Sequence, residues 1–583
     1  MKTKSITAPV KPANLPVPTL VEKNAELRLS ARKVWLWSIA GSGLLWAAFP
    51  PVNLGWLGWF ATIPWIVLAL RTESILRGGY GIIWLASWLH WAALLQGVRL
   101  AHPALYPGWL VLSAYLAIYP PLFIGLSRSL LRHGNLPAVL VLPIVWTALE
   151  YARAYIVTGF STASLSHTQV DFPYWLQIAD IAGAYSLSFV MMFATTALVL
   201  WWPRLACSWP TRLGSSIAAL LLLAATLGYG YYRLHEQYAA ANGARPTVRV
   251  LLVQGCVDTV LDNNPERPRE MLNHYQSLTF DQLAKDARYD LIVWPETVFA
   301  YPDLIAEPTA QPPPESGLNQ EKFQQQVAAH QALLKEILTY FSARMNESRP
   351  AATYFLTGIS TTSFSGTEAH TYNATLLVSP AGEPLSRYYK SHLVMFGEYI
   401  PIAEWFPWIY RLTPLPGGLS RGTGPQAFTI NKLTFSPNIC FESTVPQLIR
   451  RQVNSLEDRY EEPDVLINAT NDGWFYGSAI LDLHFQCAVL RAIENRKPLL
   501  IAANTGISGV IDGNGRVLQH GPNHATALLT AEVQADGRQS IYRTIGDWPA
   551  FLCLLVTTIA SVVVWRKSKS TSRGLVRDKT ARM

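Results

Sequence analysis

The chain has 583 residues; half are hydrophobic, only 15% are charged, and the formal net charge is +8. This composition argues against a purely soluble protein. The positive charge does not indicate nucleic-acid binding, because the basic residues gather at the two ends and between apolar runs. Five scattered cysteines form no disulfide framework, and no Cys/His cluster indicates a metal site.

Eight apolar segments are each about the length needed to cross a hydrocarbon core of about 30 Å. They lie at 34–49, 55–70, 79–98, 109–126, 137–158, 184–202, 214–232 and 548–565. The sequence therefore predicts a polytopic helical membrane bundle of about eight spans. The predicted division is a basic tail at 1–33, a membrane domain at 34–234, a catalytic domain at 235–546, a last span at 547–565 and a basic tail at 566–583.

The distribution of lysine and arginine predicts the orientation of these spans. If the N-terminus is cytoplasmic, each tail brings seven basic residues to that side and three short loops bring six more, whereas the short outside loops contain only Arg99. Positive residues favour the cytoplasmic side. Both termini are therefore expected in the cytoplasm, and 235–546 outside the membrane, in the periplasm of a Gram-negative cell.

Two ionisable residues lie within the fifth predicted span. Glu150 and Arg153 are three residues apart, so they share one helix face and can pair. One interpretation is an ion pair that reaches toward the membrane interface. The other is a contact with a lipid headgroup, because ionisable groups inside a membrane are costly. His90, in an earlier span, is expected to be a packed, hydrogen-bonded side chain.

From Val248 onward the pattern changes to short runs of β-branched residues separated by polar helical segments. This alternation predicts a layered α/β domain. The expected strands are VRVLLVQG, DLIVWPE, TYFLTGIST, YNATLLVSP, PLSRYYK, LTFSPNICFE, DVLINATN and PLLIAANTGISGVID.

Three polar residues stand at the ends of expected strands: Glu296 in WPE, Lys390 in YYKSHLVMFGEYIP and Cys440 in NICFE. Polar groups just past the carboxyl end of a buried strand are typical of α/β active sites. Singly, each has an ordinary interpretation: a helix-capping acid, a surface charge and a buried small side chain. Together, an acid, a lysine and a cysteine indicate a site for nucleophilic catalysis.

The order Glu, Lys, Cys resembles the catalytic triad of the nitrilase (carbon–nitrogen hydrolase) superfamily. The motifs VQG, WPE, YYKSHLVMFGEYIP, NICFE and NATNDGWF resemble the apolipoprotein N-acyltransferases in particular, as do EYARAYIVTGF and HTQVDFPYWLQIADIAGAYSLSFVMM in the membrane half. The resemblance covers roughly residues 35–565. It implies an αββα sandwich and a monomeric enzyme of the inner membrane without metal or other cofactor. The implied donor is a phospholipid such as phosphatidylethanolamine, and the implied acceptor is the diacylglyceryl-cysteine of an apolipoprotein.

The chemistry expected of this site starts at the thiol. Because a thiolate is the attacking form, Cys440 needs a base and a cation. Glu296 is expected to be the general base, and Lys390 to favour the thiolate and help stabilise the oxyanion. The backbone N–H of Phe441 is the expected second oxyanion donor. The acyl chain would form a thioester on Cys440 and then pass to an amine.

Further residues are candidates for supporting roles or for substrate binding. By resemblance, Glu398 lies near the triad and orients Lys390 or assists with the proton, whereas Glu442 either orders the site or contacts substrate. The aromatic stretch 401–418 is expected to be an arm that dips toward the membrane and guides acyl chains, with a packed loop as the alternative. In the loop 471–478, Trp474 and Phe475 are expected to line an acyl pocket, while Asn471 and Asp472 brace the turn. The substrate-binding candidates are Trp405, Phe406, Trp408, Asn471, Trp474, Phe475 and Arg153.

Two positions depart from the family pattern: Phe441 stands where tyrosine is common, and the loop after VQG has no tryptophan. These departures bear on acceptor or donor preference and leave the reaction type standing. Three alternatives stay open. One is a membrane-tethered amidase in which water accepts the acyl group. Another is an N-acyltransferase with a different amine acceptor. The third is a transporter or scaffold without catalysis, which the polar residues outside the bundle do not favour.

Overall fold

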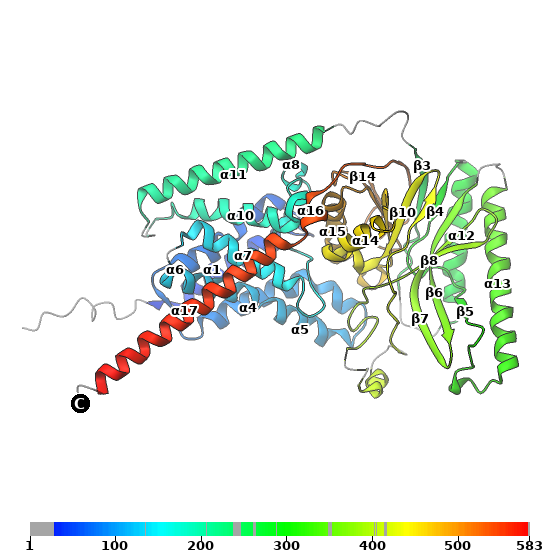
Figure 1. Ribbon diagram of the computed structural model, residues 1–583, viewed down its shortest axis with the longest axis horizontal. Coiled ribbons are helices and arrows are strands. Elements are labelled where there is room, and N and C mark those ends of the chain that lie inside the picture. The colour runs from blue at the N-terminus through cyan, green and yellow to red at the C-terminus, as the bar shows by residue number, and fades with distance from the viewer. Residues whose placement is uncertain are drawn as a thin grey trace, which may run out of the picture.

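Apolar segments from both ends of the chain form a helical bundle, and the segment between them forms two β-sheets with helices on their outer faces (Figure 1). This arrangement comes from a computed structural model. It describes residues 28–134, 136–203, 205, 207–236, 246–259, 264–286, 288–347, 352–401, 403, 405–412 and 417–580. Residues 1–27 of the first predicted basic tail and 581–583 of the second therefore lie outside the described residues.

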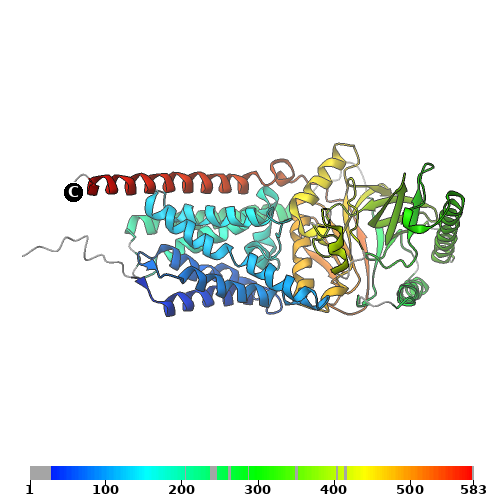
Figure 2. The ribbon, with the colours of Figure 1, turned by 90° about the horizontal axis from the view of Figure 1, so that it is seen from below.

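The bundle contains the long helices of the membrane half, which run side by side in two views (Figures 1 and 2). Short helices and one small parallel sheet, β1 (Arg28–Leu29) with β2 (Ser74–Ile75), connect them. The helices are α1 (Ala31–Ala48), η1 (Gly55–Leu57), α2 (Gly58–Ala61), α3 (Ile63–Leu70), α4 (Gly79–Leu94), η2 (Gln96–Leu100), α5 (Leu105–Leu116), α6 (Tyr119–His133), α7 (Ala138–Arg153), η3 (Leu165–Gln169), α8 (Pro173–Leu176), α9 (Ala179–Ala182), α10 (Ala184–Val199), α11 (Trp209–His235), α16 (Ile541–Ile545) and α17 (Trp548–Thr580).

Among the described residues, three helices are long and apolar enough to cross a membrane: Leu105–His133, Trp209–His235 and Trp548–Lys567. A fourth is added if the pair 173–182 and 184–199, bent by 118°, is one span. The prediction of eight spans is therefore wrong, because the described residues contain three or four helices long and apolar enough to cross a membrane. The reason is that the remaining apolar segments form shorter helices or break. The segment 55–70 divides into η1, α2 and α3, and α4 and α7 have 16 residues each.

The rest of the chain folds into a sandwich of two sheets. One sheet has the strand order β14-β13-β12-β11-β10-β9, and the other has the order β15-β3-β4-β6-β7-β8 with β5 beside β6. The central pairs β3–β4 and β10–β11 are parallel, with Val250 opposite Leu291 and Asn438 opposite Asn468. The strands are β3 (Val248–Gln254), β4 (Leu291–Val293), β5 (Asp303–Ala306), β6 (Tyr354–Ser365), β7 (Glu368–Val378), β8 (Pro384–Tyr389), β9 (Phe428–Ile430), β10 (Leu433–Ile439), β11 (Val465–Thr470), β12 (Leu499–Ala503), β13 (Gly509–Ile511), β14 (Val517–His520) and β15 (Ala527–Val533).

Alternating side chains of the strands build the layers of the sandwich. Along β3, Val250 and Leu252 point into the core between the sheets, where they join Phe435 and Ile467. The intervening side chains, such as Leu251, pack in the core that contains α12 (Arg267–Lys285) and α13 (Gln320–Asn346). This two-residue period follows from the pleat of a strand. The outer helices of the other sheet are α14 (Pro446–Glu457) and α15 (Ala479–Asn495). The layers are therefore helix, sheet, sheet, helix, as the predicted αββα sandwich requires.

The bundle packs against the α14–α15 layer, and one hydrophobic cluster contains residues of both parts. Buried charges also join them. Asp180 accepts hydrogen bonds from Arg496 Nε at 2.8 Å and Nη2 at 2.6 Å, and its Oδ2 lies 2.8 Å from Arg233 Nε. Arg496 and Asp180 are fully buried. Removing one partner of such a pair typically costs about 3–5 kcal/mol, so the charges tie the two parts firmly together.

Candidate active site

The predicted triad residues lie where strands end. Glu296 follows β4, Lys390 follows β8 directly, and Cys440 follows β10 directly. Glu296 and Lys390 are 5% and 1% exposed. Gly358 in β6 permits the close approach of the Glu296 turn, since a Cβ atom there would lie 2.4 Å from the Glu296 Cα. Because β4 and β8 belong to one sheet and β10 to the other, the three residues are drawn from both halves of the sandwich.

Lys390 and two carboxylates form a buried hydrogen-bond network. Lys390 Nζ donates to Glu296 Oε1 at 3.1 Å and to Glu398 Oε1 at 2.9 Å. The Asn373 amide donates to the same two oxygens, at 2.6 and 3.0 Å. The backbone N–H of Asn471 donates to the other oxygen of Glu296 at 2.8 Å. The structure thus brings Glu398 to the triad, and it adds Asn373, which the sequence analysis did not single out.

Cys440 occupies a constrained turn between β10 and the short helix η6 (Cys440–Thr444). Its φ is +51°, a left-handed conformation that side chains other than glycine rarely adopt. Its carbonyl oxygen accepts from Asn468 Nδ2 and His484 Nε2, each at 3.1 Å, and from Ser443 Oγ at 3.2 Å. Such a conformation persists only where the surroundings enforce it, and it is frequent at active sites. Here three donors fix the turn, while the cysteine remains half-buried.

The charges of the site act on the thiol and the lysine in opposite ways. Burial raises the pKa of Cys440 well above its ordinary value, and the Glu296 carboxylate raises it further, against the opposing effect of Lys390. Burial alone would lower the pKa of Lys390, but Glu296, Cys440 and Glu398 outweigh it and the pKa is raised well above the usual range. The resting site therefore combines a protonated thiol with a lysine cation, so attack requires removal of the thiol proton by a neighbouring base.

Glu442 connects the segment after Lys390 to the turn of Cys440. Its carboxylate accepts from the Tyr388 hydroxyl at 2.8 and 2.9 Å and from the backbone N–H groups of Ser391, His392 and Ile439 at 2.7–3.0 Å. The side chain is fully buried. With its oxygens bound to these donors, Glu442 is positioned for the first of its two predicted roles, ordering the site, and that role stays a prediction.

A second brace lies behind the nucleophile. His484 in α15 has Nδ1 3.2 Å from Asp472 Oδ1, and its Nε2 lies 2.8 Å from Ser443 Oγ as well as 3.1 Å from the Cys440 carbonyl oxygen. Asn471 Oδ1 accepts from the backbone N–H of Gly473 at 3.2 Å. Asn471 and Asp472 thus brace their turn, as predicted. His484 was missed, because its only sequence signal is a lone histidine on a helix.

The pH dependence of stability should reveal this brace. Burial lowers the pKa of His484, but Asp472 outweighs that effect and the net shift is upward. Because the folded value exceeds the unfolded value of about 6.5, the stabilisation is complete below that pH and is lost as pH rises through the folded pKa. His484→Gln should therefore lower the free energy of unfolding by roughly 1.5 kcal/mol at pH 6 and by less at pH 9. Thermal unfolding of wild type and variant across this range measures the difference.

The control for this measurement is His520→Gln, which changes an exposed histidine on β14. It should lower the melting temperature equally little at each pH. A His484→Gln deficit that is the same at pH 6 and pH 9 would show that the charge of the imidazole does not contribute.

The candidate substrate-binding aromatics occupy two loops. Trp405, Phe406 and Trp408 are 78%, 50% and 56% exposed, near the short helix η5 (Pro407–Leu412), so the alternative of a plain packed loop does not describe them. Trp474 and Phe475 lie half-buried in η7 (Gly473–Phe475), directly after the turn that contacts Glu296. The second loop is therefore beside the triad, and the first presents its rings to the surroundings.

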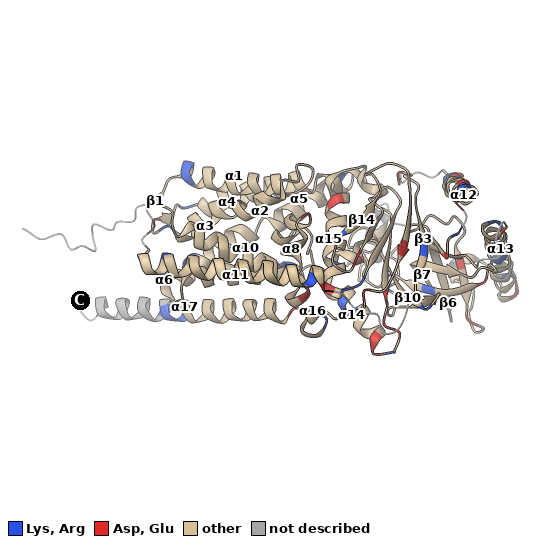
Figure 3. Ribbon diagram, turned by 90° about the horizontal axis from the view of Figure 1, so that it is seen from above, with Lys and Arg blue, Asp and Glu red and all other residues tan. Residues whose placement is uncertain are grey.

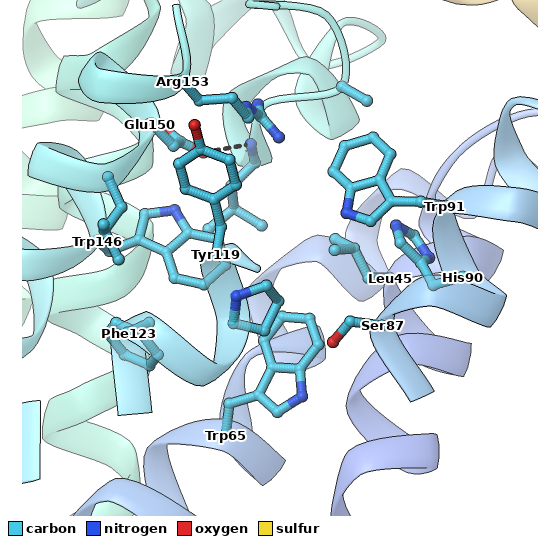
Figure 4. Close-up of a pocket in the computed structure, with 14 residues that line it drawn as sticks. Leu45, Trp65, Ser87, His90, Trp91, Tyr119, Phe123, Trp146, Glu150 and Arg153 are labelled. Atoms are coloured by element: carbon cyan, nitrogen blue, oxygen red, sulfur yellow. Dashed lines mark hydrogen bonds between the residues drawn. The ribbon is translucent and has the colours of Figure 1, made fainter. Parts of the chain in front are cut away.

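Arg153 lies apart from the triad, inside the bundle (Figure 4). Its guanidinium donates to Ser164 Oγ at 2.9 Å and to the Thr162 carbonyl oxygen at 3.4 Å. Glu150 Oε1 accepts from the backbone N–H of Leu165 at 2.8 Å. The two side chains thus bind separate parts of one loop rather than each other, which corrects the predicted pairing. The sequence spacing allowed the pair, but the loop 162–165 provides nearer partners.

Comparisons with known proteins match two separate parts of this chain to two family models. Residues 41–198 match the family described as apolipoprotein N-acyltransferase N-terminal domain, and residues 237–543 match the carbon–nitrogen hydrolase family. The apolipoprotein N-acyltransferase of Rhodopirellula baltica is 32% identical, covering 88% of this chain and 94% of the relative. That of Geobacter metallireducens is 30% identical, covering 92% and 96%. Among solved structures, an amidase from Nesterenkonia sp. is 16% identical with a TM-score of 0.33, covering 51% of this chain and 94% of its own.

The first family model thus matches most of the helical bundle, and the second matches the sandwich. The matches extend over nearly the full length of each relative. The chain belongs to the apolipoprotein N-acyltransferase family.

Proposed function

We propose that this enzyme transfers an acyl chain from a phospholipid, with phosphatidylethanolamine as the donor, to the N-terminal amine of the diacylglyceryl-cysteine of apolipoproteins. The observation that carries the proposal is the buried contact of Lys390 with Glu296, beside Cys440, in a chain that also contains a membrane bundle. A soluble amidase needs the contact between Lys390 and Glu296 beside the cysteine, but it does not need a membrane bundle. The names of the relatives supply an apolipoprotein as the acceptor, and the diacylglyceryl-cysteine is what the resemblance of the motifs implies.

The first half-reaction forms a thioester. Glu296 takes the proton from the Cys440 thiol, and the sulfur attacks an ester carbonyl of the phospholipid. Lys390 Nζ and the backbone N–H of Phe441 stabilise the oxyanion of the tetrahedral intermediate. As this intermediate collapses, the carbon–oxygen bond to the glycerol breaks, and Glu296 returns the proton to the departing alkoxide. A lysophospholipid leaves, and Glu296 is again ionised.

The second half-reaction consumes the thioester. The lipoprotein amine attacks the same carbonyl carbon and loses a proton to Glu296, while the oxyanion has the same two donors. The carbon–sulfur bond breaks, the departing thiolate takes the proton from Glu296, and an amide is formed. Glu398 accepts from Lys390 and from Asn373, and Asn373 also donates to Glu296, which supports a positioning role for both residues. This is a two-step exchange in which the first product leaves before the acceptor reacts.

The surroundings of the triad support a membrane substrate. The exposed rings of Trp405, Phe406 and Trp408 are of the kind favoured at a membrane interface, where they would guide acyl chains toward Cys440. Trp474 and Phe475, beside the triad, would line the acyl pocket. Such aromatic residues combine an apolar body with a flat contact surface.

The proposed location is the inner membrane, with both termini in the cytoplasm and the sandwich in the periplasm. The predicted bias of lysine and arginine supports it. So does the position of the basic residues at the beginning of α1 and of the blue residues of α17, at the end of the bundle far from the sheets (Figure 3). The proposed catalytic domain is 235–546, between a membrane domain at 34–234 and a final span at 547–565, and the enzyme acts as a monomer.

The test follows the fate of the acyl chain. Purified full-length enzyme in detergent micelles receives phosphatidylethanolamine with an isotope-labelled acyl chain and a synthetic diacylglyceryl-cysteine peptide. We expect labelled amide on the peptide N-terminus in an amount equal to the lysophospholipid. An N-acetylated copy of the peptide is the control and should accept nothing. Labelled free fatty acid in place of amide would indicate the tethered amidase, and no reaction with this peptide but amide on another amine would indicate a different acceptor.

A further inference from the structure

The segment that follows the exposed aromatic loop returns to the triad, where backbone hydrogen bonds fix it. The backbone N–H of Leu419 donates to the Glu398 carbonyl oxygen at 2.9 Å, and that of Gly422 donates to the Lys390 carbonyl oxygen at 2.9 Å. A Cβ atom at Gly422 would lie 2.1 Å from the last carbonyl oxygen of β8, so glycine permits this close approach. Arg421 is therefore held directly beside the backbone of two residues of the buried hydrogen-bond network.

The guanidinium of Arg421 has no anionic partner within the protein. The side chain is exposed, and its Cζ lies 5.1 Å from the centroid of the Tyr399 ring. Among the described residues, no carboxylate or other acceptor binds its N–H groups. Arg387 and Arg543, elsewhere in the sandwich, each have a carboxylate partner at 2.5 Å. The contact with the ring face orients the Arg421 cation and leaves its donors free for an anion.

The charge of Arg421 reaches the side of the site on which the nucleophile lies. Burial lowers the pKa of His392, and Arg421 lowers it further, with a larger effect than Lys390. The His392 ring is stacked on the ring of Phe441, with 5.9 Å between the centroids. Phe441 directly follows Cys440. The free cation thus acts on a side chain that packs against the neighbour of the nucleophile.

Exposed apolar rings lie in the same part of the chain as this cation. The backbone N–H of Phe396 donates to the Tyr399 carbonyl oxygen at 2.7 Å, so one tight turn presents both rings. Phe396 is 57% exposed, and Trp405, in the aromatic loop, is 78% exposed. A free cation beside exposed apolar rings suits an amphiphile with an anionic headgroup.

We propose that Arg421 binds the phosphodiester group of the phospholipid that donates the acyl chain. A guanidinium presents parallel N–H groups that match two phosphate oxygens, and the exposed rings contact the acyl chains. The phosphate and the ester groups of a phospholipid share one glycerol. A phosphate held at Arg421 therefore keeps an ester carbonyl close to Cys440. This inference rests on the proposed phospholipid donor and adds which part of the donor is recognised, and by which residue.

A binding measurement tests this site without the reaction. The full-length Cys440→Ala protein in detergent micelles is titrated calorimetrically with dihexanoyl phosphatidylethanolamine, and separately with dihexanoylglycerol, which has the same esters but no phosphate. Adding Arg421→Gln should weaken binding of the phospholipid about tenfold and leave binding of dihexanoylglycerol unchanged. Arg421→Lys keeps the charge but not the planar fork, so its affinity should fall between the two. Inorganic phosphate should not displace the phospholipid.

The matched control is Arg288→Gln, which removes an exposed arginine that precedes β4, at the end of that strand opposite Glu296. It should leave both affinities unchanged. In protein that retains Cys440, Arg421→Gln should raise the KM for phosphatidylethanolamine in the acylation step about tenfold and leave the rate at saturation unchanged. Thermal unfolding confirms that each variant is folded.

The two measurements separate this inference from the proposed reaction. If Arg421 determines phospholipid binding but no thioester forms from phosphatidylethanolamine, the proposed donor is wrong and the phosphate site stands. The site is refuted if the folded Arg421→Gln protein binds the phospholipid as tightly as its parent, or if Arg288→Gln loses as much affinity. Displacement of the lipid by inorganic phosphate would also refute it, because the site would then bind free phosphate.

Discussion

Cys440→Ser should abolish acyl transfer, with a loss of roughly 10⁴-fold or more in turnover. The catalytic residues act together, so removing the nucleophile costs about as much as removing all of them. The reason is specific to this site. The left-handed turn and the three donors to the Cys440 carbonyl oxygen hold the thiol where Lys390 and Glu296 act on it electrostatically. Serine retains that position with a much less acidic group. Intact mass spectrometry of enzyme incubated with phosphatidylethanolamine and no acceptor measures the first half-reaction.

Wild type should gain the mass of one acyl chain, and hydroxylamine should remove it, as expected for a thioester. Cys440→Ser should show no such hydroxylamine-sensitive adduct. Cys487→Ser is the control, since it makes the same substitution at the buried cysteine of α15, and its adduct should equal that of wild type. An adduct that survives in Cys440→Ser and disappears in Cys487→Ser would place the nucleophile on α15 instead of at the end of β10 and refute the proposed mechanism.

Glu296→Gln should lower turnover by about 10²–10⁴-fold, the usual contribution of a general base. The carboxylate accepts from Lys390, Asn373 and the backbone of Asn471. Glutamine has nearly the same shape, but its NH₂ group cannot accept, so one of these donors loses its partner and no group remains to take the thiol proton. Because burial and charge raise the pKa of Cys440, little thiolate forms without that base. The rate of the single-turnover acylation step measures the loss.

Glu398→Gln distinguishes a base from a positioning residue. Glu398 also contacts Lys390 Nζ and Asn373, and it accepts from the backbone of Val394 at 2.8 Å. If it acts through Lys390, its variant should lose about tenfold in acylation rate, which is well below the loss in Glu296→Gln. The assignment of the base is wrong if Glu398→Gln proves the more damaged of the two.

The position of the site was predictable because strand ends are visible in a sequence. VRVLLVQ became β3, and the residues after β4, β8 and β10 supplied Glu296, Lys390 and Cys440. The hydrogen-bond partners were not predictable in the same way. Asn373 lies 77 residues from Glu296 along the chain, and His484 lies 44 from Cys440. Which amide or imidazole reaches a buried carboxylate or carbonyl depends on how helices and sheets pack, and no local pattern records that.

The number of spans was mispredicted for a related physical reason. Hydropathy detects that a segment is apolar, not whether its backbone is one continuous helix. The segment 55–70 is apolar throughout but contains three short helices, and Gly183 separates α9 from α10 with a φ of +69°. The interior position of Glu150 and Arg153 could be predicted from the cost of charge in a membrane. Their attachment to the loop 162–165 could not, because that loop follows the helix and returns into the bundle.

The sandwich is inserted between two helices of the bundle, since α11 precedes it and α17 follows it. Arg496 reaches Asp180 across 316 residues, and α17 packs against α7. Translation therefore completes the whole sandwich before the last helix can close the bundle. A ribosome that stops before α17 leaves α7 with an open flank, and a sandwich released alone retains a buried arginine without its carboxylate. Each part of the molecule thus has a contact that is completed only when the other part is present.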